Sequence, residues 1–256
     1  MSEKKTPFLS VQSIKKSYGA VQALGGVSFD VYPGEVVALV GDNGAGKSTT
    51  IKMIAGVAQP DEGQILIEGK PVALNGPAIS EKYGIQTVYQ DLALCDNLDI
   101  VSNLYLGREL RKTRIPGVLS TLDKIQMETK AGPVLKDLKI NLPPLNSLVA
   151  SLSGGQRQVV AVARAVLWGS KLVMLDEPTA ALGVAQQRTV LDLIKNLRDK
   201  GVGVIVISHN MADVFEVADR IVVLRLGKTV ANFITKESTR EEVIAAITGA
   251  SEGGQS

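Results

Sequence analysis

The chain has 256 residues, of which 45% are hydrophobic, and its formal net charge at pH 7 is only +2. This length fits one large domain or two small ones around a buried core, and the near-neutral charge gives no overall electrostatic case for binding nucleic acid. The single cysteine, Cys95, excludes an intramolecular disulfide framework and fits a reducing compartment. No apolar leader opens the chain and no apolar run approaches the roughly 20 residues that span a bilayer. We therefore expect a cytosolic protein, or one that only a partner holds at a membrane.

Strand-like and helix-like patterns alternate in the first third of the chain. Residues 8–35 and 61–75 contain short alternating runs with turns, which predict a small antiparallel β layer. Val36–Val40 is an unbroken apolar run, typical of a parallel strand that is covered on both faces. A glycine-rich loop and a predicted helix at 49–55 follow this strand.

Residues 91–150 carry a mostly helical pattern, interrupted at Pro116–Gly117 and Pro143–Pro144, and they predict a helical lobe inserted between two halves of the sheet. After the lobe, strands are expected at 172–175, 203–207 and 221–224, with helices at 184–199 and 211–218. This alternation predicts an α/β fold with a mostly parallel sheet. We expect the two ends of the chain, including Ser251–Ser256, to fray.

The segment Gly41–Ser48 has the G-x-x-x-x-G-K-S spacing of a phosphate-binding P-loop. It follows a predicted strand and opens a helix, and this context distinguishes a P-loop from a glycine-rich turn that matches by chance. Backbone N–H groups at a helix N-terminus hold phosphate oxygens, Lys47 would supply charge to the β- and γ-phosphates, and the Ser48 hydroxyl would bind Mg²⁺. The nucleotide-binding residues expected in this segment are Gly41, Asn43, Gly44, Ala45, Gly46, Lys47, Ser48 and Thr49.

Two acidic residues, Asp176 and Glu177, end the apolar run that begins at Leu172, and Pro178 prevents the strand from continuing. A carboxylate at a strand end beside a P-loop is suited to hold Mg²⁺ indirectly, which we expect of Asp176. Glu177 is placed to polarise an attacking water. A solvated acidic turn is the alternative interpretation of the same residues.

Gln90 and the only histidine, His209, also follow predicted strands. Because ligands bind at the carboxyl ends of the strands in open parallel sheets, we expect both to share one edge with the P-loop and the two acids. We predict that His209 senses the γ-phosphate, although a lone histidine is more often structural. Gln90 would reach the metal or the water and transmit the nucleotide state to the lobe. The expected catalytic residues are Glu177, His209, Lys47 and Gln90, and the expected metal-binding residues are Ser48, Gln90 and Asp176.

Two further features have open interpretations. Tyr18 precedes the first main strand and could stack on adenine, while an ordinary packed tyrosine fits the pattern equally well. A basic cluster could contact lipid head groups or nucleic acid, but a solvated loop or helix face is the favoured interpretation. This cluster consists of Arg108, Arg111, Lys112 and Arg114.

Taken in chain order, five motifs together resemble the ATP-binding cassette (ABC) ATPases over nearly the whole chain: Gly41–Ser48, Gln90, Leu152–Gln156 (Leu-Ser-Gly-Gly-Gln), Leu172–Glu177 and His209. The resemblance implies a P-loop NTPase core of RecA-like type, with ATP and Mg²⁺ bound. It also implies a head-to-tail dimer, in which the signature of one copy faces the ATP on the P-loop of the other. The signature residues carried over are Ser153, Gly154, Gly155 and Gln156, and Tyr18 falls at the family's adenine-stacking position. The local pattern agrees, because Ser153-Gly-Gly opens a predicted helix that offers N–H groups to an anion.

The finer sequence of four segments looks like the ATPases of ribose-, xylose- and fructose-type sugar importers: Gly41–Thr49, Asp91–Asp99, Asn103–Glu109 and Thr179–Val184. One cassette with intact motifs, as in the fructose-type ATPases, implies a homodimer with two active sites. The chain departs from the general family at Ala180 and Gly183, where serine and aspartate are usual. We therefore expect the polar contacts of this loop across the dimer interface to differ.

From the resemblance we expect the energy-coupling subunit of a bacterial monosaccharide importer, peripheral at the cytoplasmic face of the plasma membrane. Integral membrane permease subunits would contact the helical lobe near Gln90, a separate protein would bind the sugar, and nucleic acid would not be a partner. The whole chain, 1–256, would be one ABC ATPase domain with a catalytic core (36–60, 76–90 and 160–245), the antiparallel layer (8–35 and 61–75) and a helical signature subdomain (91–159). The alternative is a soluble ABC ATPase that acts in translation, repair or cluster assembly. A non-hydrolysing nucleotide-binding module is disfavoured because Lys47, Glu177 and His209 are all present.

Overall fold

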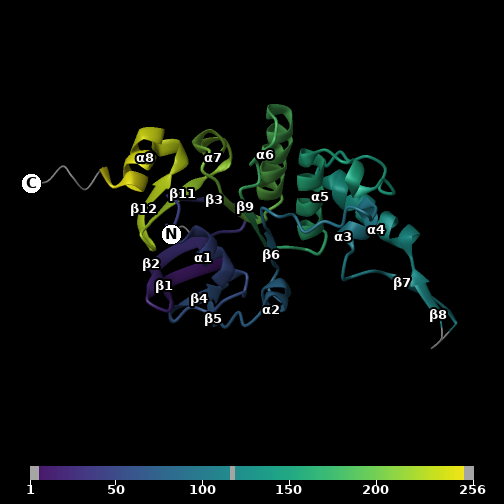
Figure 1. Cartoon of the computed structure of the whole chain (residues 1–256), viewed down its shortest axis with the longest axis horizontal. Helices are drawn as coiled ribbons and strands as arrows, with labels where there is room; N and C mark the ends of the chain where they lie inside the picture. The colour runs from purple at the N-terminus through teal and green to yellow at the C-terminus, as the bar shows by residue number, and fades with distance from the viewer. Residues whose placement is uncertain (1–5, 116–118, 251–256) are drawn as a thin grey trace, which may run out of the picture.

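A large sheet, helices on both of its faces and a separate lobe make up the protein (Figure 1). The computed structural model describes residues 6–115 and 119–250. The predicted break at Pro116–Gly117 and the predicted frayed end at Ser251–Ser256 lie outside the described residues.

The sheet has ten strands in the order β5-β4-β1-β2-β12-β11-β3-β10-β9-β6. Its central part is parallel, because β11, β3, β10, β9 and β6 pair in parallel along their shared edges. These strands are almost entirely buried, as expected where helices cover both faces. Their bounds are β3 Val36–Val40, β6 Ile85–Val88, β9 Leu172–Asp176, β10 Gly203–Ile207 and β11 Arg220–Arg225. The predicted α/β fold with a mostly parallel sheet is therefore confirmed.

The other half of the sheet is antiparallel. Its strands are β1 (Leu9–Tyr18), β2 (Val21–Val31), β4 (Glu62–Ile67) and β5 (Lys70–Val72), which lie where the sequence predicts an antiparallel layer. This half joins the central part through β12 (Lys228–Ile234), which pairs antiparallel with β11 and meets β2 at one parallel pair, Lys228 with Gly26. The two halves therefore form one continuous sheet.

Two hydrophobic cores lie on opposite faces of the sheet. Along β3, Val37 and Leu39 belong to the core under α1, whereas Val36, Ala38 and Val40 belong to the core under α5 to α8. Helix α2 packs on the first core through Ile79, and Figure 1 shows α6, α7 and α8 in a row across the opposite face. The bounds are α1 Lys47–Ile54, α2 Pro77–Lys82, α5 Gly154–Val166, α6 Val184–Asp199, α7 Met211–Val217, α8 Arg240–Thr248 and the 3-10 turn η2 Thr235–Glu237.

The lobe contains α3 (Ile100–Leu104), α4 (Lys124–Asp137), the 3-10 turn η1 (Val149–Ser151) and α5, and these elements surround a third core. The lobe lies at the end of the molecule away from α8 (Figure 1). The mostly helical prediction for 91–150 is incomplete, because β7 (Arg111–Ile115) and β8 (Leu119–Leu122) form an antiparallel hairpin.

The basic cluster was predicted to lie on a solvated loop or helix face, and this prediction is wrong for three of its four residues. Arg111, Lys112 and Arg114 lie on β7, and the sequence pattern missed the strand because its stability comes from pairing with β8. Arg111 and Lys112 are exposed. Arg108 is not free, because its guanidinium pairs with Glu81 and lies 5.0 Å from the ring centre of Trp168.

The arrangement of the parallel strands positions the site. Since β3, β6, β9 and β10 all run in the same direction, the residues that follow them meet at one edge of the sheet. Among the helices of the described ranges, none is long and apolar enough to cross a membrane.

Candidate nucleotide site

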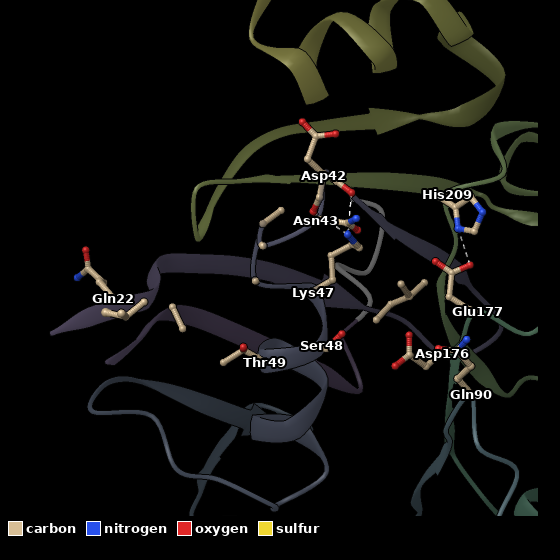
Figure 2. A pocket seen from close by; sticks show the side chains of 17 residues that line it. Gln22, Asp42, Asn43, Lys47, Ser48, Thr49, Gln90, Asp176, Glu177 and His209 are labelled. Carbon is tan, nitrogen blue, oxygen red and sulfur yellow. Dashed lines mark hydrogen bonds and ion pairs between the residues drawn. The ribbon is translucent and has the colours of Figure 1, made fainter. Parts of the chain in front are cut away.

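A pocket of about 930 Å³ opens at the edge of the sheet where these strands end. Figure 2 shows the side chains that line it, with Lys47 and Ser48 facing Asp176, Gln90, Glu177 and His209. The lining residues are Val21, Gln22, Ala23, Gly41, Asp42, Asn43, Gly44, Ala45, Gly46, Lys47, Ser48, Thr49, Gln90, Asp176, Glu177, Ile207 and His209. The structure thus brings together every residue that the sequence placed on this edge.

The P-loop connects the end of β3 to the start of α1 and depends on glycine at two positions. Gly41 has a φ of +151°, and a Cβ there would lie 2.2 Å from the carbonyl oxygen of Leu224. Gly46 caps α1 with a φ of +100°, and a Cβ there would lie 2.6 Å from Leu24 Cδ2. A side chain at either position would force the loop away from the sheet, so the cradle requires these glycines.

Lys47 extends its ammonium along the loop. The Nζ group donates to the carbonyl oxygens of Gly41 at 2.7 Å and of Asp42 at 2.9 Å. Burial lowers the pKa of Lys47, and the carboxylates of Glu177, Asp42 and Asp176 oppose this shift. The ammonium therefore lies in the pocket among carboxylates with which it makes no direct ion pair in the described structure.

Asp176 is the last residue of β9 and faces the same pocket. Burial raises the pKa of its carboxyl group, and the adjacent Glu177 carboxylate adds to the rise, while Lys47 and Lys52 act in the opposite direction. A cation bound between this carboxylate and the P-loop would relieve both causes of the shift. The site is thus electrostatically suited to a positive ion beside Asp176.

Glu177 and His209 are held in contact by neighbouring strands. Asp176 pairs with Ile207 in the parallel ladder, and the Glu177 N–H donates to the Ile207 carbonyl at 2.9 Å. The residues that follow the two strands then converge, and His209 Nδ1 lies 2.9 Å from Glu177 Oε2. Glu177 also has a positive φ of 50°, an uncommon conformation for a residue with a side chain. The carboxylate is largely buried and the imidazole largely exposed, and both residues line the pocket.

The structure places Tyr18 outside the lining of this pocket. Its ring is half exposed, and Lys16 Nζ lies 5.7 Å from the ring centre. Its antiparallel partner Val21 does line the pocket, so Tyr18 lies beside the rim. One wall of the pocket is formed by Val21, Gln22 and Ala23, and nothing in the sequence indicates that β2 reaches the P-loop.

The signature segment also lies outside the lining of this pocket, at the N-terminus of α5. Ser153 caps the helix in a capping box: its hydroxyl accepts from the Gln156 N–H at 3.3 Å, and Gln156 Oε1 accepts from the Ser153 N–H at 2.9 Å. Ser153 and Gly154 are exposed, whereas Gly155 is buried against α6, where a Cβ would lie 2.7 Å from Gln186 Cβ. Gly155 therefore has a packing role within its own chain, and Ser153 and Gly154 present the helix end to solvent.

The loop that departs from the general family, Thr179–Gly183, runs from Glu177 to α6. Gly183 caps α6 without a side chain, and Ala181 has a positive φ of 58°. The Thr179 hydroxyl donates to Asp213 Oδ2 at 2.7 Å, and both residues are buried. The loop is thus anchored to α7 at its start, while Ala181 and Gly183 are exposed.

Oxygen ligands suited to Mg²⁺ are present on this edge. The Ser48 hydroxyl, the Gln90 amide and the Asp176 carboxylate line one pocket, and hydroxyl, amide and carboxylate oxygens are the donors that Mg²⁺ prefers. Within residues 6–115 and 119–250, no group of three or more His, Cys, Asp or Glu side chains could hold a metal alone. This donor set fits an ion that shares its coordination with phosphate and water.

Comparison with known proteins agrees with this geometry. Residues 24–180 match the ABC transporter family. The chain is 49% identical to a fructose import ATP-binding protein of Rhizobium meliloti, over 96% of this chain and 95% of that protein. It is 47% identical to a xylose/arabinose import ATP-binding protein of Sulfolobus acidocaldarius, over 94% of this chain and 93% of that protein.

Solved structures give the same result. An ATP-binding cassette of an ABC transporter in its ADP conformation superposes with a TM-score of 0.78 at 28% identity, covering 94% of this chain and 95% of that one. A cassette whose dimeric structure represents a post-hydrolysis state with ADP and Pi superposes with a TM-score of 0.71 at 25% identity, covering 89% and 98%. Sequence, fold and pocket therefore agree that this chain belongs to the ABC transporter family of ATP-binding proteins.

Proposed function

We propose that this protein hydrolyses ATP as the energy-coupling subunit of an importer for a monosaccharide of the ribose, xylose and fructose class. The observation that carries the proposal is a pocket lined both by the P-loop lysine and by the Glu177–His209 pair. The relatives described above, whose names specify import of fructose and of xylose or arabinose, support the sugar class. They also favour transport over a soluble ATPase of translation, repair or cluster assembly.

The pocket residues have distinct roles in binding. Gly41, Asn43, Gly44, Ala45, Gly46 and Thr49 shape the loop that cradles the phosphates, and Lys47 turns its ammonium to the β- and γ-phosphate oxygens. Ser48, Gln90 and Asp176 would hold Mg²⁺, with Asp176 acting indirectly. When bound, the ion neutralises charge on the β- and γ-phosphates. Tyr18, beside the rim, stacks on adenine.

Hydrolysis proceeds by in-line attack of water on the γ-phosphorus, which breaks its bond to the β–γ bridging oxygen and releases ADP and inorganic phosphate. Glu177 orients and polarises the water, because its carboxylate faces the pocket and is held by His209. His209 also contacts the γ-phosphate. Catalysis rests on positioning and charge stabilisation, and Lys47 supplies a positive charge inside the pocket.

A second copy of the chain completes the site. Ser153 and Gly154 are exposed at a helix N-terminus and lie outside the pocket of their own subunit. Together with Gly155 and Gln156 they face the γ-phosphate of the other subunit, where N–H groups and the helix dipole favour an anion. The protein is therefore a head-to-tail homodimer with two ATP molecules, and the dimeric cassette structure supports this assembly.

An import function implies further protein partners. Integral membrane permease subunits contact the lobe near Gln90, and a separate protein binds the sugar. The chain then lies at the cytoplasmic face of the plasma membrane. It divides into the core, antiparallel layer and signature subdomain whose boundaries the sequence indicates.

The central experiment replaces Glu177 by glutamine. The variant keeps a side chain of nearly the same shape but loses the carboxylate, so we expect retained ATP binding, a trapped ATP-bound dimer and turnover lowered by roughly 100-fold or more. Size-exclusion chromatography with light scattering measures the dimer, and phosphate release measures turnover. Wild-type turnover in Glu177→Gln would remove Glu177 from the proposed role.

A second variant tests the shared site. Ser153→Ala should abolish hydrolysis while nucleotide affinity for the monomer's own P-loop stays near the wild-type value. Gln156 Oε1 can still accept from the backbone N–H of residue 153 in this variant, so the helix should remain folded. Loss of monomer binding together with hydrolysis would contradict the head-to-tail arrangement.

A further inference from the structure

Arg164 connects the helix that carries the signature to the segment that follows Gln90. It lies on α5, and its guanidinium donates from Nη1 to the Ala93 carbonyl at 2.9 Å and from Nη2 to the Leu92 carbonyl at 3.0 Å. One planar fork thus holds two successive carbonyls of this loop. Ala93 has a positive φ of 48°, so the loop is fixed in an uncommon conformation at the point where Arg164 holds it.

Arg164 is a partly buried charged group that forms no ion pair with the described residues. Burial lowers the pKa of its guanidinium, and the nearby Cys95 opposes the shift. In the part of the chain that the structure describes, no carboxylate forms an ion pair with Arg164. Its position is therefore fixed by the two carbonyls of the loop and not by a structural salt bridge.

A second polar side chain holds the rest of the same loop. Asn103, on α3, is fully buried, and it accepts from the Cys95 N–H at 2.8 Å while donating to the carbonyls of Cys95 and Asp99 at 3.0 Å. The segment 92–99 is thus bound to two helices of the lobe. These hydrogen bonds would carry the segment along with any displacement of the lobe.

On the other side of Gln90, the chain is bound to the core. Val88 pairs with Leu175 of β9 in the parallel ladder. Between these two anchors, Tyr89, Gln90 and Asp91 take part in none of the backbone hydrogen bonds found outside the regular elements of the described chain. Gln90 therefore lies in a short span between the core and a loop that Arg164 fastens to α5.

We propose that Arg164 is a positioning residue that converts a displacement of Gln90 by bound nucleotide into a displacement of α5 and its exposed Ser153–Gly154 end. The inference rests on the proposed function, because it assumes that Gln90 meets the nucleotide and that the signature meets the ATP of a second copy. Arg164 acts through the carbonyls of Leu92 and Ala93 and is not among the residues that line the nucleotide pocket. A chain without the Arg164 guanidinium would still bind ATP, but ATP binding would displace the Ser153–Gly154 end of α5 less.

The test compares Arg164→Met, which removes the fork, with Arg164→Lys, which keeps the charge but offers only a point donor. Arg198→Met is the matched control, because Arg198 is an arginine of α6 whose ion-pair partners are Asp199 and Asp219. All are made in the full chain, and again in the Glu177→Gln background. The measurements are ATP affinity of the monomer, the ATP concentration that gives half-maximal dimer, kcat and KM.

We expect the ATP affinity of the monomer to stay within about twofold of wild type for all variants, whereas KM should follow the ATP concentration that gives half-maximal dimer. For Arg164→Met, kcat should fall and the half-maximal ATP concentration for dimer should rise by roughly tenfold each, which is what losing about one charge-assisted hydrogen bond corresponds to. Arg164→Lys should lie between Arg164→Met and wild type, and Arg198→Met should match wild type. A residue that only stabilises the fold would lower kcat and monomer binding together.

The failures can be told apart. If wild type and Arg198→Met hydrolyse ATP and dimerise while Arg164→Met does the same with unchanged kcat, the inference is overturned. If wild type itself does not bind and hydrolyse ATP, the proposed function fails first. If Arg164→Met does not fold, Arg164→Lys carries the test, and a lysine variant that also fails to fold would assign Arg164 a purely structural role and overturn the proposal.

Discussion

Replacing Thr179 by valine should destabilise the protein, because it removes a buried hydrogen bond to the Asp213 carboxylate. The Thr179 hydroxyl donates to Asp213 Oδ2 at 2.7 Å, with the two residues only 4% and 8% exposed. Valine has nearly the same shape, so the change leaves little cavity but leaves the buried Asp213 carboxylate without this donor. The bond also anchors the segment after Glu177 to the helix after His209. The variant therefore tests what holds these two residues together.

The magnitude follows from the chemistry of the bond. A buried hydrogen bond to a charged group contributes about 1.5–3 kcal/mol to the free energy of unfolding. For a chain of this size, each kcal/mol shifts the melting temperature by roughly 2–4 °C. We therefore expect Thr179→Val to melt about 3 to 12 °C below wild type without nucleotide.

Thermal unfolding by circular dichroism and urea denaturation measure the effect. Thr179→Ser keeps the hydroxyl and should lose less than about 1 kcal/mol, as expected for one methyl group. Thr189→Val is the surface control, because the exposed Thr189 hydroxyl donates only to the Ala185 carbonyl of its own helix. It should lie within about 0.5 kcal/mol of wild type.

The comparison can fail clearly. If Thr179→Val melts within about 1 °C of wild type, the carboxylate of Asp213 finds another donor at no cost, and the anchoring argument is wrong. If Thr179→Ser is as unstable as Thr179→Val, the methyl group and not the hydroxyl carries the effect.

Three further substitutions test the site and its surroundings. Asp176→Asn should stabilise the nucleotide-free protein near neutral pH: burial and the next carboxylate raise the folded-state pKa, so the folded state binds more protons and the charged form is disfavoured. This gain should vanish as the pH falls through the raised pKa toward 3.8. Urea denaturation at a series of pH values measures the stability difference between the variant and wild type, and a difference that stayed constant or grew in acid would contradict the reasoning. Gly41→Ala places a Cβ 2.2 Å from the carbonyl oxygen of Leu224, so the loop must move, and a nucleotide affinity equal to wild type would show that the cradle tolerates the shift. Gly155→Ala places a Cβ 2.7 Å from Gln186 Cβ, and we expect overpacking of about 1–3 kcal/mol to outweigh the gain of about 1 kcal/mol in helix propensity. Urea denaturation checks this, and a variant as stable as wild type would mean that α5 can shift away from α6.

The sequence determined the features that depend on residues close together in the chain. The P-loop is one, because strand, glycines, lysine and helix start lie within Val36–Ile54. The capping box of Ser153 and Gln156 is another, since it needs only a separation of three residues. The parallel strands could also be predicted, because unbroken aliphatic runs indicate burial on both faces.

Only the tertiary structure decided which distant residues meet. Nothing local indicates that Val21–Ala23 of β2 wall the pocket, that Gly155 must be small to admit Gln186, or that Arg164 holds the carbonyls of Leu92 and Ala93. The β7–β8 hairpin was missed for the same reason. Strand pairing and side-chain contact across long separations are set by the total burial and hydrogen bonding of the folded chain, to which a local pattern contributes only in part. The grouping of the P-loop, Gln90, Asp176, Glu177 and His209 at one edge of the sheet could therefore be predicted from the sequence, whereas the contacts that join the parts of the site could not.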